Sequence, residues 1–76
     1  MTDYKPISCA NYDRFEIAIM HRESLRLIWN EENVVYDRVV TPVNLQTESG
    51  AEFLVVRGED GMQRIRLDHI RKVSAA

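Results

Sequence analysis

Hydrophobic side chains follow two different periods along this chain, and the change of period divides it into a helical part and a strand part. Between residues 12 and 22 they recur every three to four positions, the spacing of one helix face, at Tyr12, Phe15, Ala18 and Ile19. From Leu25 onward, apolar and polar residues alternate, which is typical of a strand with one buried face. We therefore predict a helix over residues 12–22 that is followed by strands.

The predicted helix carries a second stripe in which acidic and apolar side chains share one face, formed by Asp13, Glu16, Ile17 and Met20. Asn11 is expected to cap the helix, which would place Asp13 in the first turn, where the helix dipole favours a carboxylate by about 0.3 to 1 kcal/mol. In that interpretation the acidic stripe is only a solvated helix surface. The alternative is a contact surface whose carboxylates bind Arg or Lys side chains of a partner.

The first two strands are predicted within residues 25–40. The first begins at Leu25 and contains Trp29, whose phase with the neighbouring leucines indicates a place in the core. The second runs through the β-branched residues of 34–40. Pro42 weakens the continuation of this strand, because proline cannot donate a hydrogen bond to a sheet.

Three further strands complete a prediction of about five strands within residues 23–73. Asp60-Gly61 is the strongest turn signal between them, because both residues tolerate the positive φ of tight hairpin turns. The two ends are expected to be less regular, with an extended segment over 1–11 and a frayed tail over 74–76. The further strands are expected at 53–57, 62–67 and 70–73, with a loop over 46–50.

One helix followed by five short strands predicts a mainly β fold with one N-terminal α-helix. Turns about every eight to twelve residues suit a small, strongly bent antiparallel sheet or partly open barrel. The helix-first order matches an Sm-like (SH3-like) architecture, which hosts unrelated functions. At 76 residues the chain has room for a single domain over 1–76. Its 45% hydrophobic and 29% charged residues argue against disorder and against a membrane span.

The charge of the chain is unevenly distributed. Residues 1–37 carry seven acidic and four basic side chains, whereas residues 38–76 carry five acidic and six basic ones. The acidic first half favours a basic protein partner, and the net charge of −2 argues against direct binding of nucleic acid. The competing hypothesis is an Sm-like RNA-binding module with a basic strip of Arg57, Arg64 and Arg66. Arginines on the wet face of a strand, however, commonly pair with cross-strand acids such as Glu52.

Side chains with catalytic or metal-binding chemistry are few. The thiol and imidazole groups belong to Cys9, His21 and His69, which lack the spacing of a zinc site. A pair of Cys9 with His21 is the remaining enzymatic hypothesis, but no orienting group or oxyanion site can be assigned to it. We therefore expect no enzyme activity, no metal and no cofactor. A lone cysteine, with no signal segment before Tyr4, indicates the cytoplasm.

Several motifs together resemble the Rof (YaeO-like) family of Rho-binding antiterminators. The most specific is Tyr4-x-Pro6-Ile7-x-Cys9-x-x-Tyr12-Asp13-x-x-Glu16, which is followed by a short spacer to His21. The strand motifs are Leu25-x-Leu27, Glu52-Phe53-Leu54-Val55-Val56 and Arg66-Leu67-Asp68-x-Ile70. The resemblance therefore extends over nearly the whole chain.

This resemblance implies a protein that binds the N-terminal RNA-binding domain of the hexameric bacterial termination factor Rho, blocks RNA loading and inhibits Rho-dependent termination. The two matched acids would act as phosphate surrogates, the tyrosines as rigid anchors and the apolar helix residues as buried area. The residues expected to contact Rho are Asp13, Glu16, Tyr4, Tyr12, Ile17 and Met20. Those expected to lock the N-terminal segment onto the barrel are Pro6, Ile7 and Cys9.

The chain also departs from the family pattern near the helix. Ala10 and Asn11 occupy positions that are often acidic in the family, and Arg14 adds a base between the two matched acids. The contact surface is therefore expected to be less negative than the pattern implies. We also expect the free protein to be monomeric, with no direct contact to nucleic acid and none to a membrane.

Overall fold

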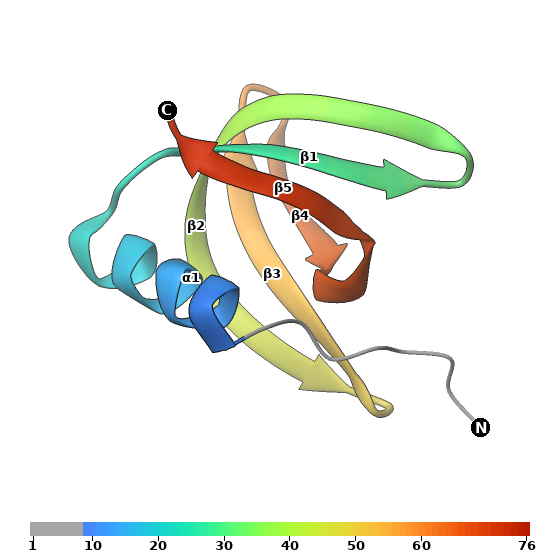
Figure 1. The fold of residues 1–76 in the computed structure, drawn as a ribbon, viewed down its shortest axis with the longest axis horizontal. Coiled ribbons are helices and arrows are strands. Elements are labelled where there is room, and N and C mark those ends of the chain that lie inside the picture. The colour runs from blue at the N-terminus through green and yellow to red at the C-terminus, as the bar shows by residue number, and fades with distance from the viewer. Residues whose placement is uncertain (1–8) are drawn as a thin grey trace.

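A computed structural model describes residues 9–76 and shows a mainly β fold with one helix, as expected (Figure 1). Five strands form one antiparallel sheet in the order β4-β3-β2-β1-β5. Within residues 9–76 no ladder joins β4 to β5, so the strongly bent sheet stays open. The elements are α1 (Cys9–His21), β1 (Leu25–Glu31), β2 (Val34–Glu48), β3 (Ala51–Gly58), β4 (Gly61–Arg66), the 3-10 turn η1 (Leu67–His69) and β5 (Ile70–Ala75).

Helix α1 begins earlier than predicted. Its first residue is Cys9, so Asn11 lies inside the helix rather than at its N-cap, and Asp13 lies beyond the first turn. Ala10 is a strong helix former and no glycine or proline interrupts 9–21, so the cap preference of Asn11 is overridden. The acidic side chain of Asp13 therefore does not serve the helix N-terminus.

The end of α1 is closed by a left-handed residue. Arg22 adopts a φ of 56°, and the N–H of Glu23 donates to the carbonyl of Ala18 at 2.9 Å. The N–H of Arg22 approaches the carbonyl of Ile19 at 3.4 Å, which completes a Schellman-type termination. This motif usually has glycine where Arg22 stands, so the backbone at this position is strained.

The apolar stripe of α1 packs on the sheet as predicted. Phe15 is fully buried and Ala18 is 2% exposed, while Tyr12 and Ile19 pack partly against the core. Figure 1 shows α1 lying beside β2. Trp29 belongs to the same core, as predicted, and remaining members include Leu25, Leu27, Val40, Leu54, Val56, Ile65 and Leu67.

Strand β2 is much longer than predicted. It runs to Glu48, through Pro42 and through most of the expected loop over 46–50. Its first half pairs with β1 and its second half pairs with β3, and the register shifts at Val43, which has no partner in β3. Proline is tolerated at such a bulge, where the ladder is already interrupted. The prolonged, bent β2 is what joins the two halves of the sheet.

Tight turns connect the strands. The β1–β2 turn at Glu32 and Asn33 and the β2–β3 turn at Ser49 and Gly50 have positive φ at both central residues, which matches the twist of a hairpin. The hairpin predicted around Asp60 is confirmed between β3 and β4, and its positive φ of 103° falls on Gly61.

The C-terminal strand is also longer than predicted. Ser74 and Ala75 belong to β5, where they pair with Arg26 and Leu25 of β1. The expected frayed tail over 74–76 is therefore wrong for these two residues, because β1 supplies a ladder up to Ala75. The helix of the described chain, α1, is neither long nor apolar enough to cross a membrane.

Candidate protein-binding surface

One face of α1 points away from the sheet and carries the second stripe of the sequence. Asp13 and Glu16 are exposed, and Ile17 and Met20 are 53% and 77% exposed. We call these four residues the outer helix face. Within residues 9–76, neither Asp13 nor Glu16 makes an ion pair or a hydrogen bond through its carboxylate. Within the described chain, this face thus combines two unpaired carboxylates with exposed apolar side chains.

Arg14 lies next to Asp13 in the sequence but interacts with a different element. Its Nη1 donates to the backbone carbonyl of Val73 in β5, at 3.3 Å. Adjacent residues of a helix do not face each other, which explains why the guanidinium turns away from Asp13. Arg14 therefore helps to hold α1 against the sheet instead of forming an ion pair with the outer helix face.

Tyr12 lies half-buried where α1 meets β3. Its hydroxyl makes a side-chain hydrogen bond with Glu52. Burial raises the pKa of Tyr12, and the nearby carboxylates of Glu52 and Glu16 raise it further. Tyr12 thus serves the docking of the helix and leaves only part of its ring at the margin of the outer helix face.

Some of the predicted contact residues cannot be placed. Tyr4, Pro6 and Ile7 lie outside the described residues. Cys9 is the first residue of α1, but its side chain is not described. The described part of the predicted contact set therefore consists of the outer helix face and Tyr12.

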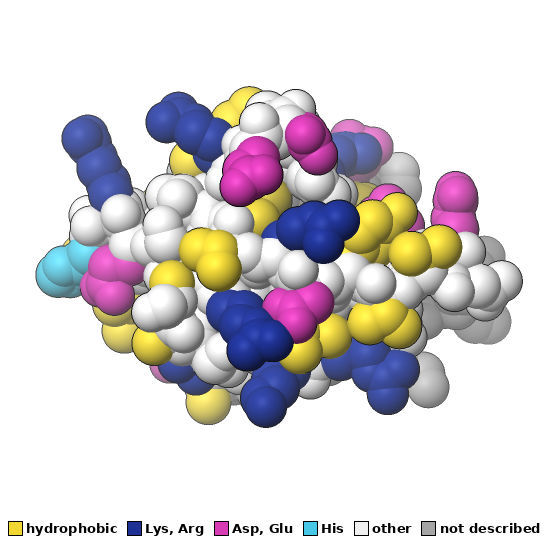
Figure 2. Space-filling model, turned by 90° about the horizontal axis from the view of Figure 1, so that it is seen from above, with side chains coloured by type: hydrophobic (Ala, Val, Ile, Leu, Met, Phe, Trp, Pro, Cys, Tyr) yellow, Lys and Arg dark blue, Asp and Glu magenta, His cyan; other side chains and the backbone are white. Residues whose placement is uncertain are grey.

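The three arginines of the predicted basic strip lie on the outer side of β3 and β4, but two of them are engaged with acids. Arg64 pairs with Glu48 at 3.1 Å, and its guanidinium lies 4.3 Å from the ring centre of Phe53. Arg66 donates to both carboxylate oxygens of Asp68, at 2.9 and 2.7 Å. On the face seen in Figure 2, basic, acidic and hydrophobic side chains are interspersed. A free basic strip of three arginines is therefore absent from the described surface.

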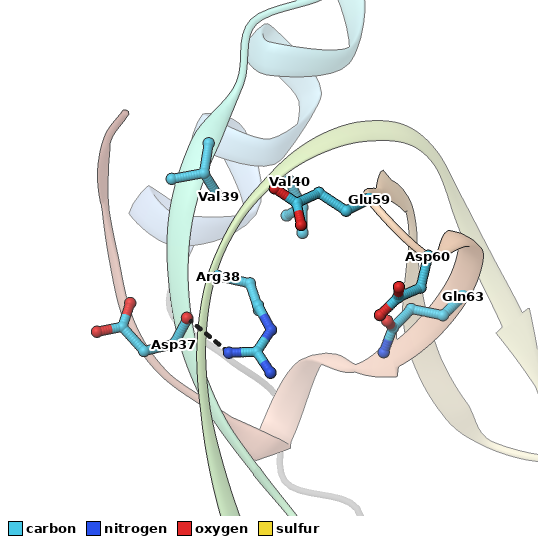
Figure 3. A pocket seen from close by; sticks show the side chains of 8 residues that line it. Asp37, Arg38, Val39, Val40, Glu59, Asp60 and Gln63 are labelled. Carbon is cyan, nitrogen blue, oxygen red and sulfur yellow. Dashed lines mark hydrogen bonds between the residues drawn. The ribbon is translucent and has the colours of Figure 1, made fainter.

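A pocket of about 430 Å³ lies between β2 and the β3–β4 turn. Figure 3 shows Arg38 pointing into it from β2, with Asp60 and Gln63 on the opposite side. Arg38 donates to the backbone carbonyl of Asp37 at 3.2 Å. The lining contains acids of both elements beside this one arginine, so its charges are partly balanced within the chain. Sequence reasoning missed this pocket, because only the strand pairing brings 37–40 beside 58–63.

The residues considered for catalysis are far apart. Cys9 and His21 stand at opposite ends of the 13-residue helix, about 18 Å apart along its axis. The proposed thiolate–imidazole pair is therefore wrong. His69 lies in η1, with its Nε2 3.9 Å from Oδ1 of Asp68. Within residues 9–76, no group of three His, Cys, Asp or Glu side chains is arranged to hold a metal ion.

Fold and surface together define a small, mainly β domain with one helix that presents a mixed acidic and apolar face. Comparison with protein-family models matches residues 6–76 to the family described as modulator of Rho-dependent transcription termination (ROF). The chain belongs to this family, and the resemblance drawn from its sequence motifs is confirmed. The family consists of regulators of transcription termination.

A solved structure shows the same fold in another setting. Proteasome accessory factor B/C (PafBC) of Arthrobacter aurescens matches 95% of this chain with a TM-score of 0.78 and 18% sequence identity. This chain spans only 12% of that protein, so the similarity concerns the fold alone. No individually curated protein sequence matches the chain.

Proposed function

We propose that this protein binds the N-terminal RNA-binding domain of the Rho hexamer through its outer helix face, blocks RNA loading there and inhibits Rho-dependent termination. The observation that supports this proposal is the state of Asp13 and Glu16, which are exposed and unpaired within the described chain. They occur in a chain whose family modulates Rho-dependent termination. We expect the free protein to be a cytoplasmic monomer.

Electrostatics supplies the competition with RNA. A surface that binds RNA phosphates is electropositive, and carboxylates form charge-assisted hydrogen bonds with the same Arg and Lys side chains. Asp13 and Glu16 are three residues apart on one helix face, so their Cβ atoms are about 5 to 6 Å apart and can engage neighbouring cations. Complementary charge also accelerates association, and this advantage decreases as salt screens it.

Apolar contact supplies the remaining affinity. Ile17 and Met20 lie on the same face as the two acids and are 53% and 77% exposed. Burying such side chains contributes about 25 cal/mol per Å² of apolar area removed from water. Tyr12 lies at the margin and can add its exposed ring edge. The interface we propose therefore combines two charged contacts with a small apolar centre, a common arrangement in protein interfaces.

Competition for Rho provides the test. The protein is titrated into preformed Rho that carries fluorescent pyrimidine-rich RNA, at two salt concentrations, with a parallel titration into RNA alone. We expect RNA release only when Rho is present, and weaker release at high salt. Fluorescence changes with RNA alone would replace the proposal by direct RNA binding, and intact Rho–RNA complex at saturating protein would exclude it.

Reversing the two charges of the outer helix face tests whether this surface contacts Rho. The variant Asp13→Lys/Glu16→Lys should bind Rho at least about 100-fold more weakly, because two attractive contacts become repulsive. A matched control, Glu59→Lys/Asp60→Lys, changes the net charge equally at an exposed turn far along the chain. Circular dichroism should show both variants folded. Equal loss of binding in the control would mean that net charge, rather than the outer helix face, determines recognition.

A further inference from the structure

A second pocket lies at the C-terminal end of α1, on a different side of the helix from the outer helix face. It has a volume of about 450 Å³, which falls within the size range of small-molecule sites. It is formed where the last turn of the helix, the bulge of β2 and the end of β3 meet. Its lining residues are Ile19, Arg22, Thr41, Pro42, Val43 and Arg57, and none of them is acidic.

The two arginines of this pocket differ from the paired arginines of the sheet. In the part of the chain that the structure describes, neither Arg22 nor Arg57 has an ion pair or a side-chain hydrogen bond. Arg26, Arg64 and Arg66, by contrast, each bind a carboxylate. Two uncompensated guanidinium groups share one concave site, so the local potential is positive in a chain that is acidic overall.

The backbone around the pocket is irregular in two places that face it. Arg22 holds its left-handed φ of 56° at the helix terminus, where a cation is favoured by the helix dipole. Val43 is the bulge residue and has no partner residue in β3, so the ladder is interrupted beside the pocket. The hydroxyl of Thr41 lies 3.0 Å from that of Ser24 and adds a further polar group. The site thus offers hydrogen-bond donors on two sides.

We infer that this pocket binds the phosphate group of a nucleoside monophosphate. Guanidinium groups from two elements can approach a tetrahedral phosphate from different directions, whereas a planar carboxylate is satisfied by one bidentate arginine. A terminal monoester also carries more negative charge than a phosphate within an RNA chain. The apolar wall of Ile19, Pro42 and Val43 suits the sugar or base, and the volume exceeds the need of a bare phosphate.

Nuclear magnetic resonance titration of the full chain tests this inference without Rho, so its outcome is independent of the proposed function. The probes are uridine monophosphate, uridine, inorganic phosphate and an oligouridine without a terminal phosphate. We expect saturable shifts of the Thr41 and Val43 amides with the monophosphate, weaker shifts with inorganic phosphate, and none with uridine. Equal shifts with uridine, or stronger ones with the oligouridine, would overturn the inference.

Two variants and one control locate the binding. Arg22→Gly removes one guanidinium while placing the preferred residue at a left-handed position, so the fold is retained. Arg57→Gln removes the other, and each change should weaken binding about tenfold through loss of a charge-assisted hydrogen bond. Arg71→Gln also removes one positive charge, at an exposed site of β5, and should leave the affinity for the monophosphate unchanged. Undiminished binding in a variant that combines Arg22→Gly with Arg57→Gln, or an equal loss in the Arg71→Gln control, would contradict a specific site.

Discussion

The outer helix face and the outer side of the β3–β4 hairpin both carry charged side chains beside apolar ones, but they differ in how the charges are paired. On the hairpin, Arg64 and Arg66 bind Glu48 and Asp68. On the helix, the carboxylates of the outer helix face have no partner within the described chain. At Arg64 and Arg66 the first surface is therefore neutralised by acids of its own fold, whereas the two acids of the second surface have no such partner within the described chain.

Secondary structure explains this difference. A side chain on a sheet has neighbours on other strands of the same face, so Arg64 on β4 reaches across β3 to Glu48 on β2. A side chain on the outer face of a helix meets only residues three or four positions away. No residue three or four positions from Asp13, in either direction, is basic. Unpaired charge on a helix is therefore a better indicator of a contact surface than charge on a strand.

The largest expected effect follows from removing the attachment of α1 to the sheet. Phe15→Ala opens a cavity under the helix and should lower the free energy of unfolding by about 3 to 5 kcal/mol, a large share of the total for a domain of this size. Urea unfolding followed by circular dichroism measures the loss. Rho binding should decrease in parallel, because the outer helix face depends on this anchor for its position.

A conservative substitution provides the control for this prediction. Phe15→Leu keeps most of the apolar volume and should cost less than about 1.5 kcal/mol, with Rho binding retained. An unfolding midpoint of Phe15→Ala at the same urea concentration as that of the unmodified protein would contradict the contribution of α1 to the core that the burial of Phe15 indicates.

An intermediate effect is expected on the hairpin side, where a substitution should lower the stability of the fold and leave Rho binding unchanged. Arg66 is 25% exposed and Asp68 is 9% exposed, so Arg66→Met removes two charge-assisted hydrogen bonds from a mostly buried carboxylate. The free energy of unfolding should decrease by about 1 to 2 kcal/mol, measured by urea unfolding. Arg71→Met, at an exposed site, should change it by less than about 0.5 kcal/mol.

Rho affinity distinguishes the two surfaces when Arg66→Met is compared with the charge reversal of the outer helix face. Arg66→Met should bind Rho as well as the unmodified protein does, whereas the charge reversal of the outer helix face should weaken binding at least about 100-fold and leave the stability unchanged. A marked loss of Rho affinity in folded Arg66→Met would place the hairpin within the interface and remove the contrast between the two surfaces.

Local periodicity was sufficient to predict the parts of the fold that depend on one element at a time. The burial of Phe15, Ala18 and Trp29 follows from spacing alone, since a helix or a strand can bury only one of its faces. The same spacing identified the exposed stripe of α1. The family resemblance added the expected partner, and the family itself is confirmed.

Features that depend on pairing between distant segments could not be predicted in this way. The continuation of β2 through Pro42 requires a bulge, and the pairing with β3 determines where that bulge can form. The two pockets and the ion pair of Arg64 with Glu48 also depend on how the strands pair. Pro42 inside an apolar run is a signal for a bulge. Proline also commonly marks the end of a strand, and the sequence alone does not distinguish the two.

The smallest expected effect concerns the junction of the two regions, where Tyr12 of α1 hydrogen-bonds to Glu52 of β3. The pKa of Tyr12 is raised above its model-peptide value of 10.0, first by burial and then by nearby carboxylates. A raised pKa in the folded state means that the stabilising contribution of Tyr12 is complete below pH 10 and is lost as the pH rises through the folded-state pKa.

At pH 7, Tyr12→Phe should lower the free energy of unfolding by about 0.5 to 1 kcal/mol through loss of this hydrogen bond. Above pH 10 the difference between the two proteins should shrink and then reverse, because phenylalanine cannot ionise against Glu52. Urea unfolding across this pH range measures the crossing, and a difference that stays constant with pH would show that Tyr12 does not couple the helix to the sheet through its hydroxyl.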